Sequence, residues 1–305
     1  MRATVAGAPV SFGVFELTPE GAETIAPDDL LATLAESDYR GVDLGPSGFF
    51  GQGAQLRARL RSHGLELAGG WVQLPFSDDE AFEAALPQLH DALRAFSDAA
   101  EEGPDRLPLP TLADGGSAAR QGAPGRGADI DPLADAAWGR LLANTERAAA
   151  IVRAAGFEPT FHHHAGTFVE SPDEIDRFLA NVDVDLTLDT GHLFIAGGDP
   201  LDAVQRWGDR INHLHLKDVD LAALTRVLAA GGGMREVWSS GAFVAFGQGD
   251  IDLGAVMNAV DARSFDGWIV VEQDVLNGPD VSLSAFRAAR GADQVRNREA
   301  LRPWA

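Results

Sequence analysis

Residues 171–192 read SPDEIDRFLANVDVDLTLDTGH and place a helix directly before a strand. The opening Ser-Pro-Asp-Glu supplies an N-cap, a proline suited to the first helical turn and early carboxylates, which together favour a helix over 172–180. The apolar run at 184–189 then predicts a strand that ends at Asp189. A helix that leads straight into a strand is the building unit of α/β folds.

The same unit recurs along almost the whole chain. Strands are expected at 3–8, 41–44, 65–72, 107–112, 158–163, 184–189, 211–216 and 268–272. Amphipathic helices are expected at 28–37, 51–63, 81–99, 132–155, 172–180 and 199–207. Eight strands in 305 residues predict one α/β domain over 1–305, a (β/α)8 TIM barrel. An open doubly wound sheet is the alternative, but the glycine-rich phosphate turn typical of that fold does not follow the first strand.

Three segments depart from the regular pattern. The fourth strand is the weakest, because 107–112 contains two prolines that a central strand should not tolerate. The Gly/Pro-rich segment 114–131 predicts a mobile loop after that strand. The tail at 282–305 predicts a final helix that could close the barrel or help to pack a homo-oligomer.

Composition limits the partners and the location. The net charge of −22 disfavours nucleic acid and anionic membranes as partners. No apolar run approaches the roughly 20 residues of a membrane span, and the first residues do not resemble a signal peptide, so a cytoplasmic protein is expected. The chain has no cysteine, which excludes thiolate metal sites. Lys217 is its only lysine.

Potential metal ligands follow four consecutive predicted strands. Because barrel enzymes carry their active sites at the carboxyl ends of the strands, these residues are expected to meet. They are His162 and His164 after the fifth strand, Asp189 and His192 after the sixth, His213 and His215 in the seventh, and Glu272 at the end of the eighth. Imidazole and carboxylate ligands without thiolates suit Mn²⁺, Co²⁺, Fe²⁺ or Zn²⁺ and indicate a catalytic site. Alternation along the strand places His162 and His164 on one face and His163 on the other.

Two other strand ends supply weaker candidates. Asp43, at the end of the second strand, could hold substrate hydroxyls or could cap a turn. Trp71, in the third strand, could form a wall on which a sugar stacks, although a core aromatic is the simpler interpretation.

Four motifs carry a resemblance to a known family, and the likeness covers most of the chain. At HHHAGT (162–167), LDTGHLFIAGGDP (188–200), INHLHLKDV (211–219) and GWIVVEQD (267–274), the sequence resembles the xylose-isomerase-like barrel superfamily of sugar isomerases, epimerases and dehydratases. Within it, the sequence is most similar to the inosose dehydratase family.

The resemblance implies a divalent metal held by Asp189, His215 and Glu272. Relatives usually place a glutamate at the fourth ligand position, which falls here within the three histidines. The Ala-Gly pair that follows favours His162 as the ligand, whereas counting back from Glu170 favours His164, and both remain open. Mn²⁺ or Co²⁺ is the expected cofactor, with Zn²⁺, Fe²⁺ or Mg²⁺ as alternatives.

The histidine in place of a glutamate also bears on the reaction. Related epimerases resemble one another in using two metal-bound glutamates as an acid and base pair, and this chain lacks one of them. The resemblance therefore implies a lyase that dehydrates a cyclic keto-polyol by α-proton abstraction and loss of a β-hydroxyl. A keto-sugar isomerase or epimerase is the alternative, and a non-catalytic sugar-binding barrel is a third reading. A nuclease of the same superfamily is disfavoured by the charge.

The resemblance also suggests roles for individual residues. Glu272 is expected to act as both base and metal ligand. The acid is expected to be Lys217, whose pKa a neighbouring cation could lower, or one of the histidines His164 and His192. Asp43, Trp71 and Glu170 are expected to bind the substrate, a small polyol or keto-sugar.

Overall fold

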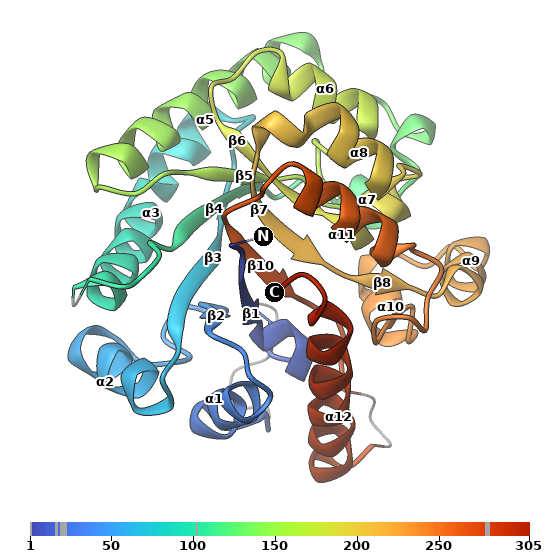
Figure 1. The fold of residues 1–305 in the computed structure, drawn as a ribbon. Helices are drawn as coiled ribbons and strands as arrows, with labels where there is room; N and C mark the ends of the chain where they lie inside the picture. The colour runs from blue at the N-terminus through green and yellow to red at the C-terminus, as the bar shows by residue number, and fades with distance from the viewer. Residues whose placement is uncertain (1, 16–17, 19–22, 102, 278–280) are drawn as a thin grey trace.

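The computed structural model describes residues 2–15, 18, 23–101, 103–277 and 281–305, and its centre is a closed parallel barrel (Figure 1). Around the barrel the strands follow the order β1-β10-β7-β6-β5-β4-β3-β2. Their bounds are β1 Thr4–Gly7, β2 Gly41–Asp43, β3 Glu66–Leu74, β4 Leu109–Asp114, β5 Thr160–His162, β6 Asp185–Asp189, β7 Ile211–Leu216 and β10 Trp268–Val271. The predicted (β/α)8 TIM barrel is confirmed.

Helices surround the barrel, as Figure 1 shows. They include α1 Pro27–Glu36, α2 Gly53–His63, α3 Asp79–Ala100, α5 Asp135–Ala154, α6 Pro172–Leu179, α7 Thr190–Ile195, α8 Pro200–Trp207 and α11 Leu253–Ala262. The start of α6 forms a capping box, in which Ser171 and Glu174 each bond to the other's backbone N–H. The C-terminal helix α12, Leu283–Leu301, packs against α1 and against the 3₁₀ turn η1 at Pro9–Phe12.

The fourth strand forms despite its prolines and is displaced along the chain. It was expected at 107–112 and runs from Leu109 to Asp114. Its pairing with β5 begins only at Thr111, so Pro110 precedes that ladder and its missing N–H removes no bond from it. The displacement puts the Asp114 carboxylate at the strand's carboxyl end.

The segment 114–131 is more ordered than a simple loop. It contains the short helix α4, Ala118–Gln121, and the 3₁₀ turn η2, Gly127–Asp129. Arg120 of α4 is buried, with its guanidinium against the carboxylates of Glu170 and Glu174 at 3.3 and 2.7 Å. This ion-pair network attaches the segment to the start of α6.

An insertion between β7 and α11 was not anticipated from the sequence. It consists of β8 Asp218–Val219, α9 Leu221–Ala229, α10 Met234–Ser239 and β9 Phe243–Val244, and Figure 1 shows α9 and α10 beside β8 at the edge of the ring of helices. Its apolar side chains, among them Leu224, Met234 and Val237, form a cluster distinct from the main core. None of the helices in the described ranges is long and apolar enough to cross a membrane.

The main core lies between the strands and the outer helices, and Phe161 of β5 illustrates it. Its ring is fully buried and lies 4.0 Å from that of Phe178 on α6, measured between centroids.

We expect Phe161→Ala to lower the free energy of unfolding by about 3–5 kcal/mol, since it removes a close-packed aromatic ring and leaves a cavity. Urea unfolding followed by circular dichroism measures this loss. Leu107→Ala is the control: Leu107 is 50% exposed, so its change should stay within about 0.5 kcal/mol. Equal losses in the two variants would contradict this account of the core.

Candidate functional site

Strand register brings four of the predicted ligands to one place. Asp189 at the end of β6 pairs with His215 of β7, and His215 pairs in turn with Val270 of β10, two residues before Glu272. His162, at the end of β5, lies beside Thr187 of β6. The four side chains therefore come from neighbouring strands at the carboxyl end of the barrel, as expected for this fold.

Their potential ligand atoms converge. His162 Nε2 lies 3.2 Å from His215 Nδ1 and 3.4 Å from Asp189 Oδ2. His215 Nδ1 lies 3.8 Å from Asp189 Oδ2 and 2.9 Å from Glu272 Oε2. His162, Asp189 and His215 form the compact part of this group, with one ligand atom each within 4.8 Å of the others, and Glu272 joins it through His215. The geometry thus groups His162, and not His164, with these residues.

These separations and the local charge fit a divalent cation. An ion about 2.1 Å from each ligand atom has neighbouring ligands about 3.0 Å apart in octahedral geometry and about 3.4 Å apart in tetrahedral geometry. The carboxylates of Asp189, Glu272 and Asp274 are all buried here around one ammonium, that of Lys217. Such an excess of buried negative charge is stabilised by a bound cation. The donor set of imidazoles and carboxylates is one that Mn²⁺, Co²⁺, Fe²⁺ and Zn²⁺ accept.

Lys217 lies at the centre of the carboxylates. Its ammonium donates to Asp189 Oδ2 at 2.5 Å and to Glu272 Oε2, and it lies 3.3 Å from Asp274 Oδ1. Burial alone would lower the pKa of Lys217, but the three carboxylates raise it above its ordinary value. Without a bound cation, the Lys217 side chain is therefore an ammonium at neutral pH, and a pKa lowered by a neighbouring cation stays a prediction for the metal-bound protein.

The carboxylates at this centre differ from one another. Burial would raise the pKa of Glu272, but His215 and Lys217 hold it well below its usual range, so Glu272 is ionised. Burial raises the pKa of Asp274 to about 6, and Lys217 offsets only part of that rise. Asp274 was missed in the sequence, although it lies only two residues beyond Glu272 in the last strand-end motif.

His164 and His192 form a second group with Asp274. The centroids of the two imidazole rings lie 3.5 Å apart, and the ring planes are tilted by 35°. His192 Nε2 is 3.1 Å from Asp274 Oδ2, and His164 Nδ1 is 2.7 Å from the carbonyl oxygen of Ala165. Burial lowers the pKa of both histidines well below the ordinary value, so both rings are neutral at pH 7. One potential ligand atom from each of the three residues lies within 4.8 Å of the others, which makes this a second candidate metal cluster.

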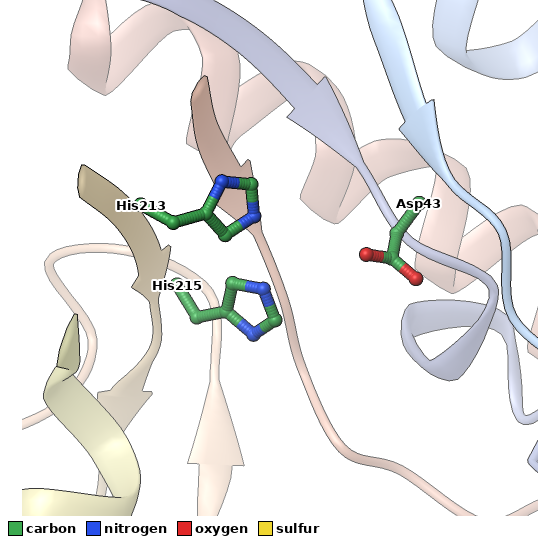
Figure 2. A group of neighbouring side chains, drawn as sticks. All are labelled: Asp43, His213 and His215. Atoms are coloured by element: carbon green, nitrogen blue, oxygen red, sulfur yellow. The ribbon is translucent and has the colours of Figure 1, made fainter. Parts of the chain in front are cut away.

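A third cluster lies on the opposite side of His215. Figure 2 shows Asp43 on one side, facing His213 and His215 across the barrel. All three side chains are buried, and within the described part of the chain Asp43 Oδ2, His215 Nε2 and both ring nitrogens of His213 have no hydrogen-bond partner. Burial raises the pKa of Asp43 to about 6. His215 therefore presents one ring nitrogen to the centre with Asp189 and the other to this cluster.

His163 faces away from these groups, as alternation predicts. It is fully buried, and its Nε2 accepts a hydrogen bond from the backbone N–H of Asp189 at 3.2 Å. This contact holds the backbone at the end of β6, from which the Asp189 side chain extends toward His162 and His215.

A cavity of about 780 Å³ opens above the strand ends. Predicted residues that line it are Asp43, Trp71, His162, His164, His192, His215, Lys217 and Glu272. Trp71 places its ring edge-on to His162 and His164, with centroids 5.2 and 5.3 Å away. The lining also includes Asp114 and Trp238, which sequence reasoning missed. A carboxylate at the end of β4 was visible in the sequence, whereas Trp238 belongs to the unanticipated insertion.

Glu170 has a different place from the one expected. It is not among the described residues that line the cavity. Its carboxylate contacts Arg120 at 3.3 Å and accepts a hydrogen bond from the backbone N–H of Gly125. Glu170 thus holds the segment 114–131 in place and is not part of the described cavity lining.

Comparison with known proteins agrees with this geometry. A family model described as xylose isomerase-like TIM barrel matches residues 31–292. The chain belongs to this family. It is 31% identical over 283 residues to inosose dehydratase from Geobacillus kaustophilus, covering 88% of this chain and 86% of that one. The inosose dehydratase of Bacillus velezensis is 30% identical over 254 residues, covering 80% of each chain.

Solved structures share the fold at low sequence identity. A probable 3-DHS dehydratase from Bacillus anthracis superposes with a TM-score of 0.67 at 14% identity, over 98% of both chains. D-allulose 3-epimerase from Methylomonas sp. in complex with D-allulose gives a TM-score of 0.69 at 16% identity, over 100% of this chain and 98% of that one.

The buried carboxyl group of Asp43 provides a test of the third cluster. The folded protein binds its proton up to about pH 6 and the unfolded chain only up to about pH 4, so stability is lost as the pH rises through this interval. In the metal-free protein, Asp43→Asn should raise the free energy of unfolding by roughly 2–3 kcal/mol above about pH 7 and should change it little below about pH 4. Urea unfolding at the two pH values measures the difference. Asp202→Asn, at an exposed position on α8, is the control and should not raise the free energy of unfolding at either pH. A gain from Asp43→Asn that is the same at both pH values would contradict a buried, protonatable Asp43.

Proposed function

We propose that this protein is a metal-dependent hydro-lyase that removes water from a cyclic keto-polyol of the inosose type. The observation that carries the proposal is the convergence of His162, Asp189, His215 and Glu272 beneath a cavity large enough for such a ring. The inosose dehydratases that match most of the chain support the same reaction. The substrate is a small molecule, and we propose a cytoplasmic location.

The cofactor we propose is Mn²⁺ or Co²⁺, with Zn²⁺, Fe²⁺ or Mg²⁺ as alternatives. The ligands we assign to it are His162, Asp189, His215 and Glu272. A divalent ion bound there would polarise the substrate carbonyl and make the neighbouring C–H more acidic.

The residues around the centre have distinct tasks in this proposal. Glu272, kept ionised by His215 and Lys217, takes up the α-proton at its carboxylate. The departing β-hydroxide is protonated by Lys217 or by an N–H of the His164 and His192 pair, which line the same cavity. Substrate hydroxyls are held by Asp43, and Trp71 forms the wall beside the ring. Transfer of one proton to the base and one from the acid releases water and leaves an enol-dione.

Epimerisation is the alternative reaction. A symmetric epimerase needs a base on each face of the substrate carbon, and here one of the positions is His162. Burial lowers the pKa of His162 while Asp189 partly opposes that effect, so its ring is neutral and is poorly matched to the Glu272 carboxylate as a partner in such a pair.

The decisive experiment is an assay of the metal-reconstituted protein with 2-keto-myo-inositol. We expect absorbance from a conjugated enol-dione to increase, and NMR in D₂O to show loss of water. A deuterated isomer of the substrate would favour the epimerase, and the absence of any turnover would contradict the proposal.

Replacing the proposed base tests its role. Glu272→Gln should lower kcat by about 10²–10⁴-fold, because the amide cannot accept the α-proton. Circular dichroism and a thermal melt establish that the variant is folded. Glu158→Gln is the matched control, since Glu158 is exposed before β5 and pairs only with Arg153 in the described contacts. Activity retained in Glu272→Gln would reject this assignment.

Metal removal tests the centre independently of the base. Chelation should abolish turnover and lower the melting temperature, because an ion bound only by the folded state stabilises it. Elemental analysis should find about one divalent ion per chain, and Asp189→Asn should bind it at least about tenfold more weakly. If chelation changes neither the melting temperature nor the activity, the metal-dependent proposal fails.

A further inference from the structure

The cavity is larger than a ring keto-polyol needs. Such a ring has about a dozen non-hydrogen atoms, and even at the roughly 30 Å³ that one water occupies in the liquid it would fill about 360 Å³. The cavity measures about 780 Å³, a size typical of sites that enclose drug-sized ligands. About half of it therefore remains for a second group attached to the ring.

The remaining lining is mixed, with polar side chains such as Gln73, Gln121 and Thr167 and one apolar part. The apolar part consists of Val10 in η1, Phe15 just after it, and Met234 and Trp238 on α10; we call these four residues the apolar arm. The rings of Phe15 and Trp238 lie 5.2 Å apart and are tilted by 42°. The indole Nε1 of Trp238 is buried and has no hydrogen-bond partner among the described residues.

The apolar arm is held by several parts of the fold. Met234 is buried in the insertion's own apolar cluster, together with Val237. The carbonyl of Trp238 accepts a hydrogen bond from the backbone N–H of Leu276, beyond β10, at 3.0 Å. Phe15 comes from the segment after β1, distant from α10 in the sequence, and its ring packs against that of Trp238. The arm is therefore a formed wall and not a single exposed side chain.

Charge limits what the second group can be. Of the described cavity residues, Lys217 is surrounded by carboxylates and Arg235 is exposed at the rim. Five carboxylates share the lining, those of Asp43, Asp114, Glu236, Glu272 and Asp274. A phosphate or another anionic group would meet net negative charge from these side chains.

We propose that the substrate is a ring keto-polyol that carries a neutral aromatic substituent, with the substituent lying against the apolar arm. This inference rests on the proposed function for the ring end of the cavity. Phe15 and Trp238 supply aromatic surface to the substituent. Trp238 is then a specificity-determining residue of the insertion.

Binding of unreactive analogues tests the substituent without requiring turnover. Titration calorimetry on the metal-loaded protein would compare myo-inositol, its monophosphate, and the series of ethers in which each ring hydroxyl in turn carries a phenyl group. At least one phenyl ether should bind about tenfold or more tightly than myo-inositol, as expected for burial of an aromatic ring. The monophosphate should bind no more tightly than myo-inositol. If no phenyl ether exceeds the parent, the inference is overturned.

Single substitutions test whether the tighter binding of phenyl ethers depends on the apolar arm. Trp238→Leu should reduce the ratio of phenyl-ether to myo-inositol affinity to within about threefold. Phe15→Leu should also reduce it, so the result does not depend on the folding of α10 alone. Leu221→Ala is the control, because Leu221 lies on α9 of the same insertion and is 47% exposed. An unchanged ratio in both Trp238→Leu and Phe15→Leu would overturn the assignment of the arm.

Measurements of turnover distinguish a failure of the aromatic-substituent proposal from a failure of the proposed dehydration. Keto forms of myo-inositol and of its best phenyl ether would be assayed together. Turnover of both with equal kcat/KM, and equal binding, would overturn the substituent alone. A phenyl preference in binding without turnover of either ketone would overturn the proposed dehydration instead.

Discussion

The burial of three carboxylates around the single ammonium of Lys217 is the constraint on which the site depends. Asp189, Glu272 and Asp274 lose their hydration there and share the Lys217 ammonium, while His215 adds a close contact to Glu272. A flexible loop could not hold such groups together. The closed barrel can, because its strand backbones are bonded on both sides and their ends are fixed by register.

The same constraint gives chemically identical groups different properties. Glu272, beside His215 and Lys217, stays ionised, whereas Asp43 and Asp274 hold their protons to about pH 6. His215 lies between two of these environments and presents one ring nitrogen to each. A cavity built this way can hold a base, proton donors and cation ligands within one small volume.

The sequence predicted the elements whose signals are local and periodic. β7 was expected at 211–216 and occupies Ile211–Leu216, and the histidines and carboxylates at strand ends were found because a barrel brings such ends together. Glu170 was misplaced because its partner, Arg120, lies fifty residues earlier in a segment without a periodic pattern. The insertion was missed because its strands have two residues each and its helices pack on a separate cluster. Such contacts depend on tertiary packing and leave no local signature.

The separate apolar cluster of the insertion affects which amino-acid substitutions this protein can tolerate. Substitutions on α10 act mainly on the cluster around Met234 and Val237, while the barrel keeps its own core. The part of the cavity wall on α10 can therefore change in sequence while the main core behind the strands stays the same. The cavity wall and the cluster at the strand ends are thus open to mutation in separate parts of one chain.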